Sequence, residues 1–260
     1  MNTFIMYFNR ITLLLMHLGA IGLVVTADNP LTIFLLGLLL SYIMRNILLS
    51  AIYHKLFAHN AFTPKSWVPT VGNILGFVYF MPPSRTFYVE HITHHRLVDT
   101  EEDILYPGRN IIVRTFPFLF NRVKLVTPEV AKLKRTLAIR YEEKNPWSKK
   151  FNLEFRMVTI IVAYLSFYVI DYNLFSVMLV SASLFHYVGY VGNVVPHNRF
   201  DADGKAITTN HRWLSWMLWA TDFDHKDHHD KPKDLHYGPV GPAKTLQFIV
   251  GLLSSKQRTD

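Results

Sequence analysis

Cysteine is absent from this sequence of 260 residues. Without thiolates the chain has no disulfides, and it cannot hold a thiolate zinc site, an iron–sulfur cluster or a thiolate-ligated haem. Any bound metal must therefore be held by nitrogen and oxygen ligands. Histidine can supply the nitrogen, and the sequence contains 13 histidines.

Acidic residues are also scarce relative to basic ones, with 19 Asp and Glu against 27 Lys and Arg and a formal net charge of +8. Such an excess of positive charge is found in nucleic-acid binders. The positions of the basic residues favour another explanation, because these residues avoid the tips of two apolar hairpins.

Hydrophobic residues make up 50% of the chain and concentrate in four stretches. Each approaches the length of about 20 residues that a membrane-spanning helix needs. The stretches form two pairs, each interrupted by only a few polar residues, so each pair predicts a helical hairpin. The predicted spans are 11–27, 31–52, 153–170 and 174–195. Arg45 lies near one end of the second span, from which it can snorkel to the interface.

Lys and Arg are missing from both hairpin tips, whereas segment 45–150 carries sixteen of them and segment 199–260 carries nine. Positively charged loops stay in the cytoplasm, so we expect residues 53–152 and 196–260 to be cytoplasmic. A cleaved N-terminal signal peptide is the alternative, and the second apolar stretch, which begins a few residues later, disfavours it. The prediction is one all-α integral membrane domain, 1–260, with four transmembrane helices.

Three further segments predict pieces that do not cross the membrane. Segment 67–81 is apolar but too short to span comfortably, which indicates an interfacial or re-entrant piece. Segment 121–150 is mostly charged and predicts a cytoplasmic helical cap. The stretch "LQFIVGLL" near the C-terminus predicts an amphipathic helix on the membrane surface.

Eight histidines fall in three short boxes, "HKLFAH" at 54–59, "HITHH" at 91–95 and "HKDHH" at 225–229. In the second and third boxes the offsets 0, 3 and 4 place all three rings on one face of a helix. His54 and His59 stand about 140° apart on an ideal helix, so a helix end or a local distortion must bring them together.

One HxxHH box alone more often marks a polar surface helix. Three boxes on the same predicted side of the membrane indicate a shared site instead. Eight imidazoles are too many for one metal ion, and neutral imidazole suits iron, zinc or copper. A cluster of two ions is the economical interpretation.

The end of the fourth span adds candidates on one helix face, because His186, Asn193 and His197 are spaced seven and four residues apart. We expect His197 to be a ligand and the deeper His186 to make a structural hydrogen bond. Carboxylates crowd the boxes, and some should accept N–H bonds from ligating imidazoles. The expected acceptors are Asp99, Asp103 and Asp222.

These motifs resemble those of the integral-membrane fatty-acid desaturases, most closely the stearoyl-type Δ9 group. "YHKLFAHNAF" is similar to that group's first box, "EHITHHRLVDTEED" to its second, "NVVPHNRFD" to its Asn-x-x-x-His element and "HKDHH" to its third. The sequence departs from the group before the third box, where "DFD" replaces Gly-Glu-Gly. It departs again after Asn193, where bulkier residues stand.

The resemblance implies a cytoplasm-facing di-iron centre, O2 as co-substrate, and an acyl chain carried by coenzyme A, a carrier protein or a lipid. It implies nine histidine ligands and an asparagine that holds one iron through water. These map to His54, His59, His91, His94, His95, His197, His225, His228, His229 and Asn193.

Acyl-chain desaturation is therefore the expected activity. Related hydroxylation, acetylenic-bond formation, and carotenoid or alkane oxygenation are the alternatives, and a metal transporter or sensor is the non-enzymatic one. The chain lacks a GxGxxG loop, so we expect electrons from a separate ferredoxin or b-type cytochrome. Aromatic residues are candidates for a substrate tunnel or, alternatively, an interfacial belt. They are Phe77, Phe80, Tyr88, Trp213 and Trp216.

Overall fold

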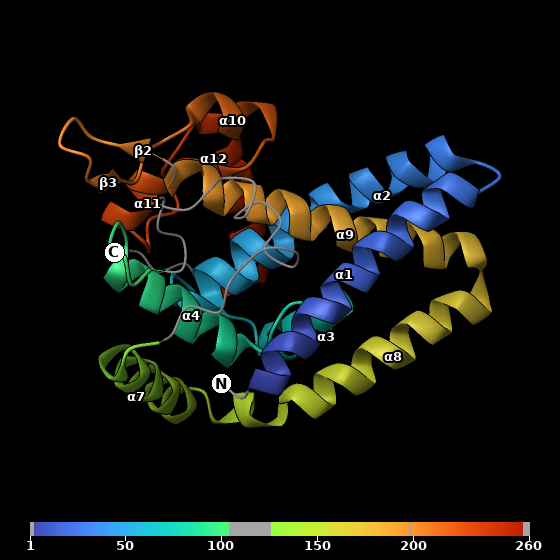
Figure 1. Cartoon of the computed structure of the whole chain (residues 1–260), viewed down its shortest axis with the longest axis horizontal. Helices are drawn as coiled ribbons and strands as arrows, with labels where there is room; N and C mark the ends of the chain where they lie inside the picture. The colour runs from blue at the N-terminus through green and yellow to red at the C-terminus, as the bar shows by residue number, and fades with distance from the viewer. Residues whose placement is uncertain (1–2, 104–125, 198, 257–260) are drawn as a thin grey trace.

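The computed structural model describes residues 3–103, 126–197 and 199–256, most of them helical. Four long helices project to one side of a head that is built from the shorter elements (Figure 1). The long helices are α1 (Thr3–Thr26), α2 (Pro30–Met44), α8 (Leu153–Ile170) and α9 (Tyr172–Val194). They overlap the four apolar stretches and pair as the two predicted hairpins, although α1 begins before residue 11 and α2 ends at Met44, before the predicted end at residue 52.

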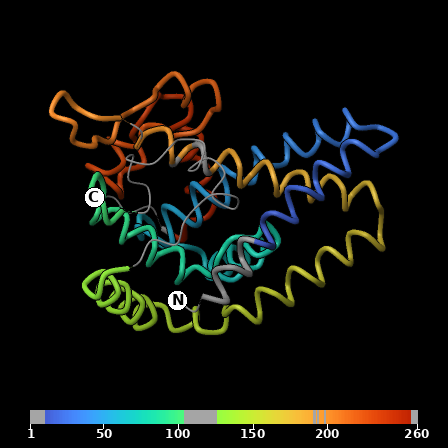
Figure 2. The backbone as a smooth tube through the Cα atoms, in the orientation of Figure 1, coloured from blue at the N-terminus to red at the C-terminus, as the bar shows by residue number. Residues whose placement is uncertain are grey.

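The two hairpins interlock through α9, which packs against α2 and α1 as well as against its own partner α8. Gly37 permits the close approach of α2 and α9, because a Cβ atom there would lie 2.6 Å from the Val180 Cγ1 atom. Helix α8 diverges from the α2–α9 pair with distance from the hairpin tip, as the backbone trace shows (Figure 2).

The outward faces of α1 and α8 are apolar, since residues such as Leu15, Leu18, Ile161 and Leu165 are exposed. By length and composition, the segments Pro30–Ala58 and Leu153–Ile170 could cross a membrane, and the apolar helix Ile11–Thr26 is shorter. The count of four spans therefore stays a prediction.

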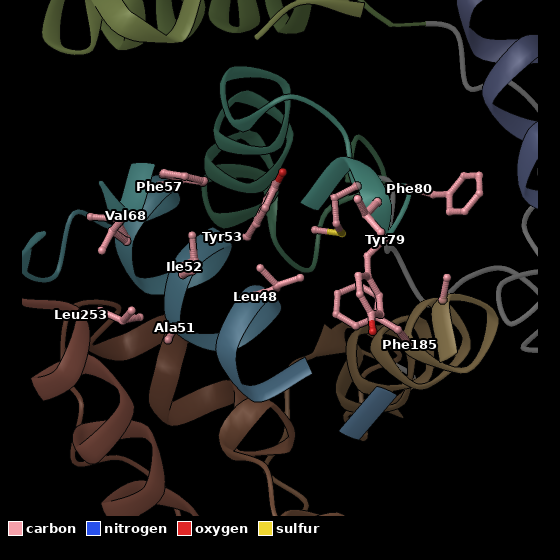
Figure 3. Packing of buried hydrophobic residues seen from close by; sticks show 14 of the residues in the cluster. Leu48, Ala51, Ile52, Tyr53, Phe57, Val68, Tyr79, Phe80, Phe185 and Leu253 are labelled. Atoms are coloured by element: carbon pink, nitrogen blue, oxygen red, sulfur yellow. The ribbon is translucent and has the colours of Figure 1, made fainter. Parts of the chain in front are cut away.

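Helix α2 continues without a break into η1 (Arg45–Ala58), a π-helix. Its backbone bonds join residues five apart, a pattern that is rare and usually confined to a single turn near functional sites. The element runs through the centre of the head, and twelve of its residues are buried. Figure 3 shows its apolar side chains packed against neighbouring helices.

Two helices that follow η1 in the sequence pack against it. They are α3 (Val68–Val78) and α4 (Ser84–Leu97). Helix α7 (Pro128–Lys144) then packs against α4, and the short helix η2 (Pro146–Lys150) follows it and leads into α8. The charged cap predicted for 121–150 is therefore helical over its described part. Helix α3 packs between η1 and α8, so the segment predicted to be interfacial or re-entrant also forms part of the core.

The C-terminal quarter of the chain closes the head from the opposite side (Figure 1). Its helices are η3 (Val195–His197), α10 (Arg212–Met217), η4 (Thr221–Phe223), α11 (His225–Asp230) and α12 (Val240–Leu253). Two small antiparallel pairs join β1 (Thr63–Pro64) to β4 (Ser254–Lys256) and β2 (Arg199–Phe200) to β3 (Ala206–Ile207). The helix predicted near the C-terminus is α12, with Leu246 and Val250 buried and Phe248 exposed; its placement on a membrane surface stays a prediction.

Arg45 differs from the expectation that it snorkels to an interface. Its side chain is almost fully buried, and its Nη2 atom lies 3.0 Å from Oδ2 of Asp222. A buried guanidinium without a carboxylate partner would be strongly destabilising. The ion pair therefore attaches the end of α2 to the segment just before the third histidine box.

Candidate metal centre

The structure gathers the nine candidate histidines into two adjacent groups. The potential ligand atoms within each group lie within 4.8 Å of one another. The first group contains His54, His59, His91, His95 and His228. The second contains His94, His197, His225 and His229. The rings of His95 and His229, one from each group, are stacked with their centroids 4.1 Å apart.

Each HxxHH box contributes to both groups. On α4, His91 and His95 belong to the first group and His94, at offset 3, belongs to the second. On α11 the division is reversed: His228, at offset 3, belongs to the first group, and His225 and His229 belong to the second. Residues at offsets 0 and 4 differ by about 40° on a helix, while offset 3 lies about 60° to the other side. One face of each helix thus serves two neighbouring sites, a division that the sequence interpretation did not anticipate.

The π-helical backbone explains how His54 and His59 converge. The N–H group of His59 donates to the carbonyl oxygen of His54 at 3.2 Å, which is an i→i+5 bond. Side chains five residues apart therefore leave a π-helix in similar directions, whereas on an α-helix their directions would differ by about 140°. The local distortion that the spacing required is this change of helix type.

His197 lies in the short helix η3 that follows α9 and belongs to the second group. The side chain of Asn193 lies outside the described residues, so its proposed place beside an iron stays a prediction. His186 makes the expected structural hydrogen bond, in which its Nε2–H group donates to the carbonyl oxygen of Tyr79. His17 contacts Ser183, and His211 contacts Thr209, away from both groups.

The spacing of the imidazole nitrogens suits metal ligation. Two nitrogens bound at about 2.1 Å from one ion and about 90° apart are roughly 3 Å from each other. In the first group, Nε2 of His54 lies 2.8 Å from Nε2 of His228, and Nε2 of His59 lies 2.9 Å from that of His91. The arrangement has the dimensions of a shell of ligands around a shared centre.

Hydrogen bonding among the rings cannot account for this packing. The Nε2 atom of His91 faces those of both His59 and His95, and the Nε2 atom of His228 faces those of both His54 and His95. A neutral imidazole nitrogen carries either one proton or one lone pair. Five nitrogens in such a chain satisfy at most two of the four contacts, and the other contacts need a shared cation.

Burial favours the neutral form of three of these rings, those of His59, His95 and His225. Burial, with the charges of neighbouring residues, lowers the pKa of His59 to about 3 and the pKa of His95 to about 2. Burial likewise lowers the pKa of His225 to about 3. Metal ligation requires the unprotonated nitrogen, so the site presents its ligand atoms in the binding form at neutral pH.

Two of the three predicted carboxylate acceptors hold rings of the second group. Nδ1 of His94 lies 3.0 Å from both carboxylate oxygens of Asp103, and both side chains are buried. Asp99 acts through Thr208, whose Oγ1 donates to the carboxylate and lies 3.0 Å from Nδ1 of His197. These contacts fix the rings so that Nε2 faces the group, the usual arrangement around a ligated metal.

The third predicted acceptor, Asp222, touches both groups. Its backbone carbonyl accepts from Nδ1 of His225 at 3.2 Å, and its carboxylate lies 3.9 Å from Nδ1 of His54. The same carboxylate accepts from Ser50 and pairs with Arg45. Asp222 therefore connects the π-helix, the first group and the second group.

Sequence interpretation missed two supporting residues, Thr208 and Lys55. Thr208 lies in no box, and no local pattern marks it. Lys55 is fully buried beside His54, and its Nζ atom donates to the carbonyl oxygens of Pro232 and Asp234 at 2.8 and 2.7 Å. A lysine between buried apolar residues was an available signal, because a buried charge needs partners.

The five predicted tunnel residues do not come together. Phe77 and Phe80 pack on aromatic rings of α8. Trp213 and Trp216 are 63% and 51% exposed, as an interfacial belt would require. Tyr88 lines a cavity between η1 and α7.

Comparison with known families agrees with this geometry. The family model described as "Fatty acid desaturase" matches residues 29–238, which is most of the chain and includes all nine histidines of the two groups. A search of curated proteins found no match. Three histidine boxes, their meeting in two groups and the extent of the match lead to one conclusion: the chain belongs to the fatty acid desaturase family.

Proposed function

We propose that this chain is an O2-dependent acyl desaturase that uses two iron ions held by the two histidine groups. One observation carries the proposal: nine imidazoles meet in two adjacent groups whose nitrogens are spaced for metal ligation. Membership of the family supplies the oxidoreductase class. Desaturation of the stearoyl type is our proposal for the reaction within that class.

The irons, once bound, would supply the strong oxidant that removal of hydrogen from an unactivated methylene requires. The overall reaction balances when a –CH2–CH2– unit loses two hydrogens and a donor gives two electrons. With two protons from solvent, O2 is then reduced to two water molecules. The protein's own residues must hold the ligands, position the chain and exclude bulk water.

The residues around the histidines suit these tasks. Asp103 and the Asp99–Thr208 pair accept or relay the Nδ1 protons of His94 and His197, which leaves the Nε2 lone pairs directed at the metal site. The apolar surroundings of η1 bury His54, His59 and His228 of the first group.

We further propose that α1, α2, α8 and α9 span a membrane and that the head with the histidine groups faces the cytoplasm. The exposed apolar faces of the long helices support this placement, because such surfaces are stable in lipid and unfavourable in water. The concentration of Lys and Arg outside the hairpin tips supports the orientation.

Electrons would come from a separate ferredoxin or b-type cytochrome that docks on the basic face of the head. Exposed charges are screened beyond about 10 Å at 0.1 M salt, so donor-dependent turnover should fall as salt rises. Turnover of the purified chain with NADPH and O2 alone would contradict this part of the proposal.

Product analysis tests the function directly. We would express the chain in a host that lacks its own desaturase and examine the fatty acids by gas chromatography and mass spectrometry. A new double bond is the expected result. A hydroxylated, acetylenic or carotenoid product would move the chain to a related oxygenase activity, and loss of all new products would reject the enzymatic proposal.

A further inference from the structure

The two histidine groups differ in the charges attached to their rings. In the second group, two carboxylates are connected to Nδ1 atoms, on the side away from the shared centre. Asp103 accepts directly from His94, with both carboxylate oxygens 3.0 Å from Nδ1. Asp99 is connected to His197 through the hydroxyl of Thr208. The second group therefore carries two negative charges beside its ligands.

The first group has no such attachment within the described part of the chain. None of its five rings hydrogen-bonds a carboxylate there, and only Asp222 comes within ion-pair distance of one, with Oδ1 3.9 Å from Nδ1 of His54. This distance is too long for a hydrogen bond. The same carboxylate pairs with Arg45 at 3.0 Å, which offsets its charge.

The connection from Asp99 to His197 is fixed by several bonds. Asp99 has a φ of 62°, in the left-handed region that few side chains other than those of Asn and Asp adopt. From this position its carboxylate accepts from the backbone N–H and from the hydroxyl of Thr208, at 3.0 to 3.1 Å. A hydroxyl has one proton, so Oγ1 of Thr208 then accepts from Nδ1–H of His197 at 3.0 Å.

This difference in attached charge affects how strongly each group stabilises an oxidised metal. A hydrogen bond from the N–H group of a ligating imidazole to a carboxylate makes the ring a stronger donor. Negative charge near an ion also favours its higher charge, and this attraction is stronger in a buried site than in water. Both effects act on the second group, so it should favour Fe3+ over Fe2+ more than the first group does.

We propose that the iron position of the second group has the lower reduction potential of the two, and that Thr208 is a positioning residue that couples the charge of Asp99 to it. This inference rests on the two-iron site of the proposed function and deepens it. Each iron takes up one electron when Fe3+ becomes Fe2+. The first electron from a donor would therefore reside on the first group, and the second electron on the second group.

A redox titration tests this order. The full chain in detergent, loaded with 57Fe, would be poised at a series of potentials, and Mössbauer spectra would count Fe2+ and Fe3+. Two one-electron steps, each of half the iron, are expected. Thr208→Val removes the hydroxyl but retains the backbone N–H that also holds Asp99. The lower potential should then rise by on the order of tenfold in the Fe3+/Fe2+ equilibrium, which is about 59 mV, and the upper potential should move less.

Three further variants separate this role from space filling. Thr208→Ser restores the hydroxyl and should give wild-type potentials. Thr209→Val is the matched control, because the Thr209 hydroxyl contacts Pro196 and His211 instead of Asp99 or a ligand. It should move neither potential. Asp99→Asn removes the charge with little change of shape and should raise the lower potential at least as far as Thr208→Val does.

The inference is wrong if both irons of the wild type share one potential, if Thr208→Val shifts mainly the upper step, or if Thr209→Val gives an equal shift. Should Thr208→Val not retain two irons, Asp99→Asn decides by the same criterion. Equal potentials in a chain that forms double bonds would reject this inference alone. Two potentials in a chain that forms no double bond would reject the desaturase proposal alone, and a wild type that cannot hold two irons would reject both.

Discussion

Each of four rings in the centre, those of His94, His197, His225 and His54, has a partner on or near the nitrogen that faces away from the groups. Such contacts select the tautomer and leave the other nitrogen for the metal. The identity of the nine histidines followed from spacing and from the resemblance. The hydrogen-bond partners of these histidines were predicted only in part. Asp103, a carboxylate close to the second box in the sequence, could be predicted, whereas Thr208 could not.

Replacement of single ligands gives the first prediction. His94→Ala and His228→Ala remove one ligand from the second and first group respectively, so both variants should lose bound iron and form no product. Iron per chain would be measured in protein grown with iron, because imidazole sites also take up zinc.

Loss of the fold is the confounding explanation, since removal of a buried polar partner can destabilise a protein. The variants should therefore still elute as one monodisperse species. His211→Ala and His236→Ala, histidines outside both groups, should retain iron and product. An undiminished yield of double bonds from His94→Ala would refute the metal-centre assignment.

Among the elements, η1 is the one whose shape the sequence interpretation did not foresee. The ends of the long helices at the hairpin tips were predictable because polar residues interrupt the apolar stretches there. The π-helix was not, because an interpretation at 3.6 residues per turn offers no pattern for it. A signal does exist in hindsight: Arg45, Ser50 and Lys55 recur every five residues, and all three contact the segment 222–234.

Lys55→Met tests this attachment of η1. The substitution retains the apolar stem but removes the donor to the carbonyl oxygens of Pro232 and Asp234, which leaves buried acceptors unsatisfied. We expect a loss of about 1–3 kcal/mol in the free energy of unfolding, measured as a lower midpoint in thermal or denaturant unfolding. Lys226→Met, at an exposed position of α11, should leave the midpoint unchanged. Equal midpoints for both variants would show that the attachment is unimportant.

For the whole molecule, the arrangement of two hairpins with one charged head predicts a topology that labelling can test. The absence of native cysteine makes single-cysteine variants clean probes. Asp28→Cys and Tyr172→Cys place a thiol at each hairpin tip, where both positions are exposed. A membrane-impermeant reagent added outside should label both. Labelling only after the cytoplasmic side is opened would reverse the orientation.

The collected histidines also predict how the metal-free protein responds to acid. The pKa values of His59, His95 and His225 are lowered in the folded state to about 3, 2 and 3. Below about pH 6.5 the unfolded chain takes up protons that the folded chain does not, so stability falls as pH falls, by up to about 1.4 kcal/mol per pH unit for each ring. Above about pH 6.5 these groups add no pH dependence.

Unfolding of chelator-treated protein, followed between pH 7.5 and 5, would measure this slope. Iron-loaded protein should resist the change over the same range, because protons must then compete with the metal for the ligand nitrogens. A metal-free protein whose unfolding midpoint does not vary with pH would contradict the neutral, buried state of these rings.

His94 and His95 are consecutive residues of α4, yet they belong to different groups, and the same holds for His228 and His229 on α11. Two short helices thus act as rigid spacers between the metal positions. The groups contain no carboxylate among the described residues that could bridge two ions. If each group held one metal ion, adjacent residues of the same two helices would supply ligands to both ions, so the positions of α4 and α11 would set the distance between the ions.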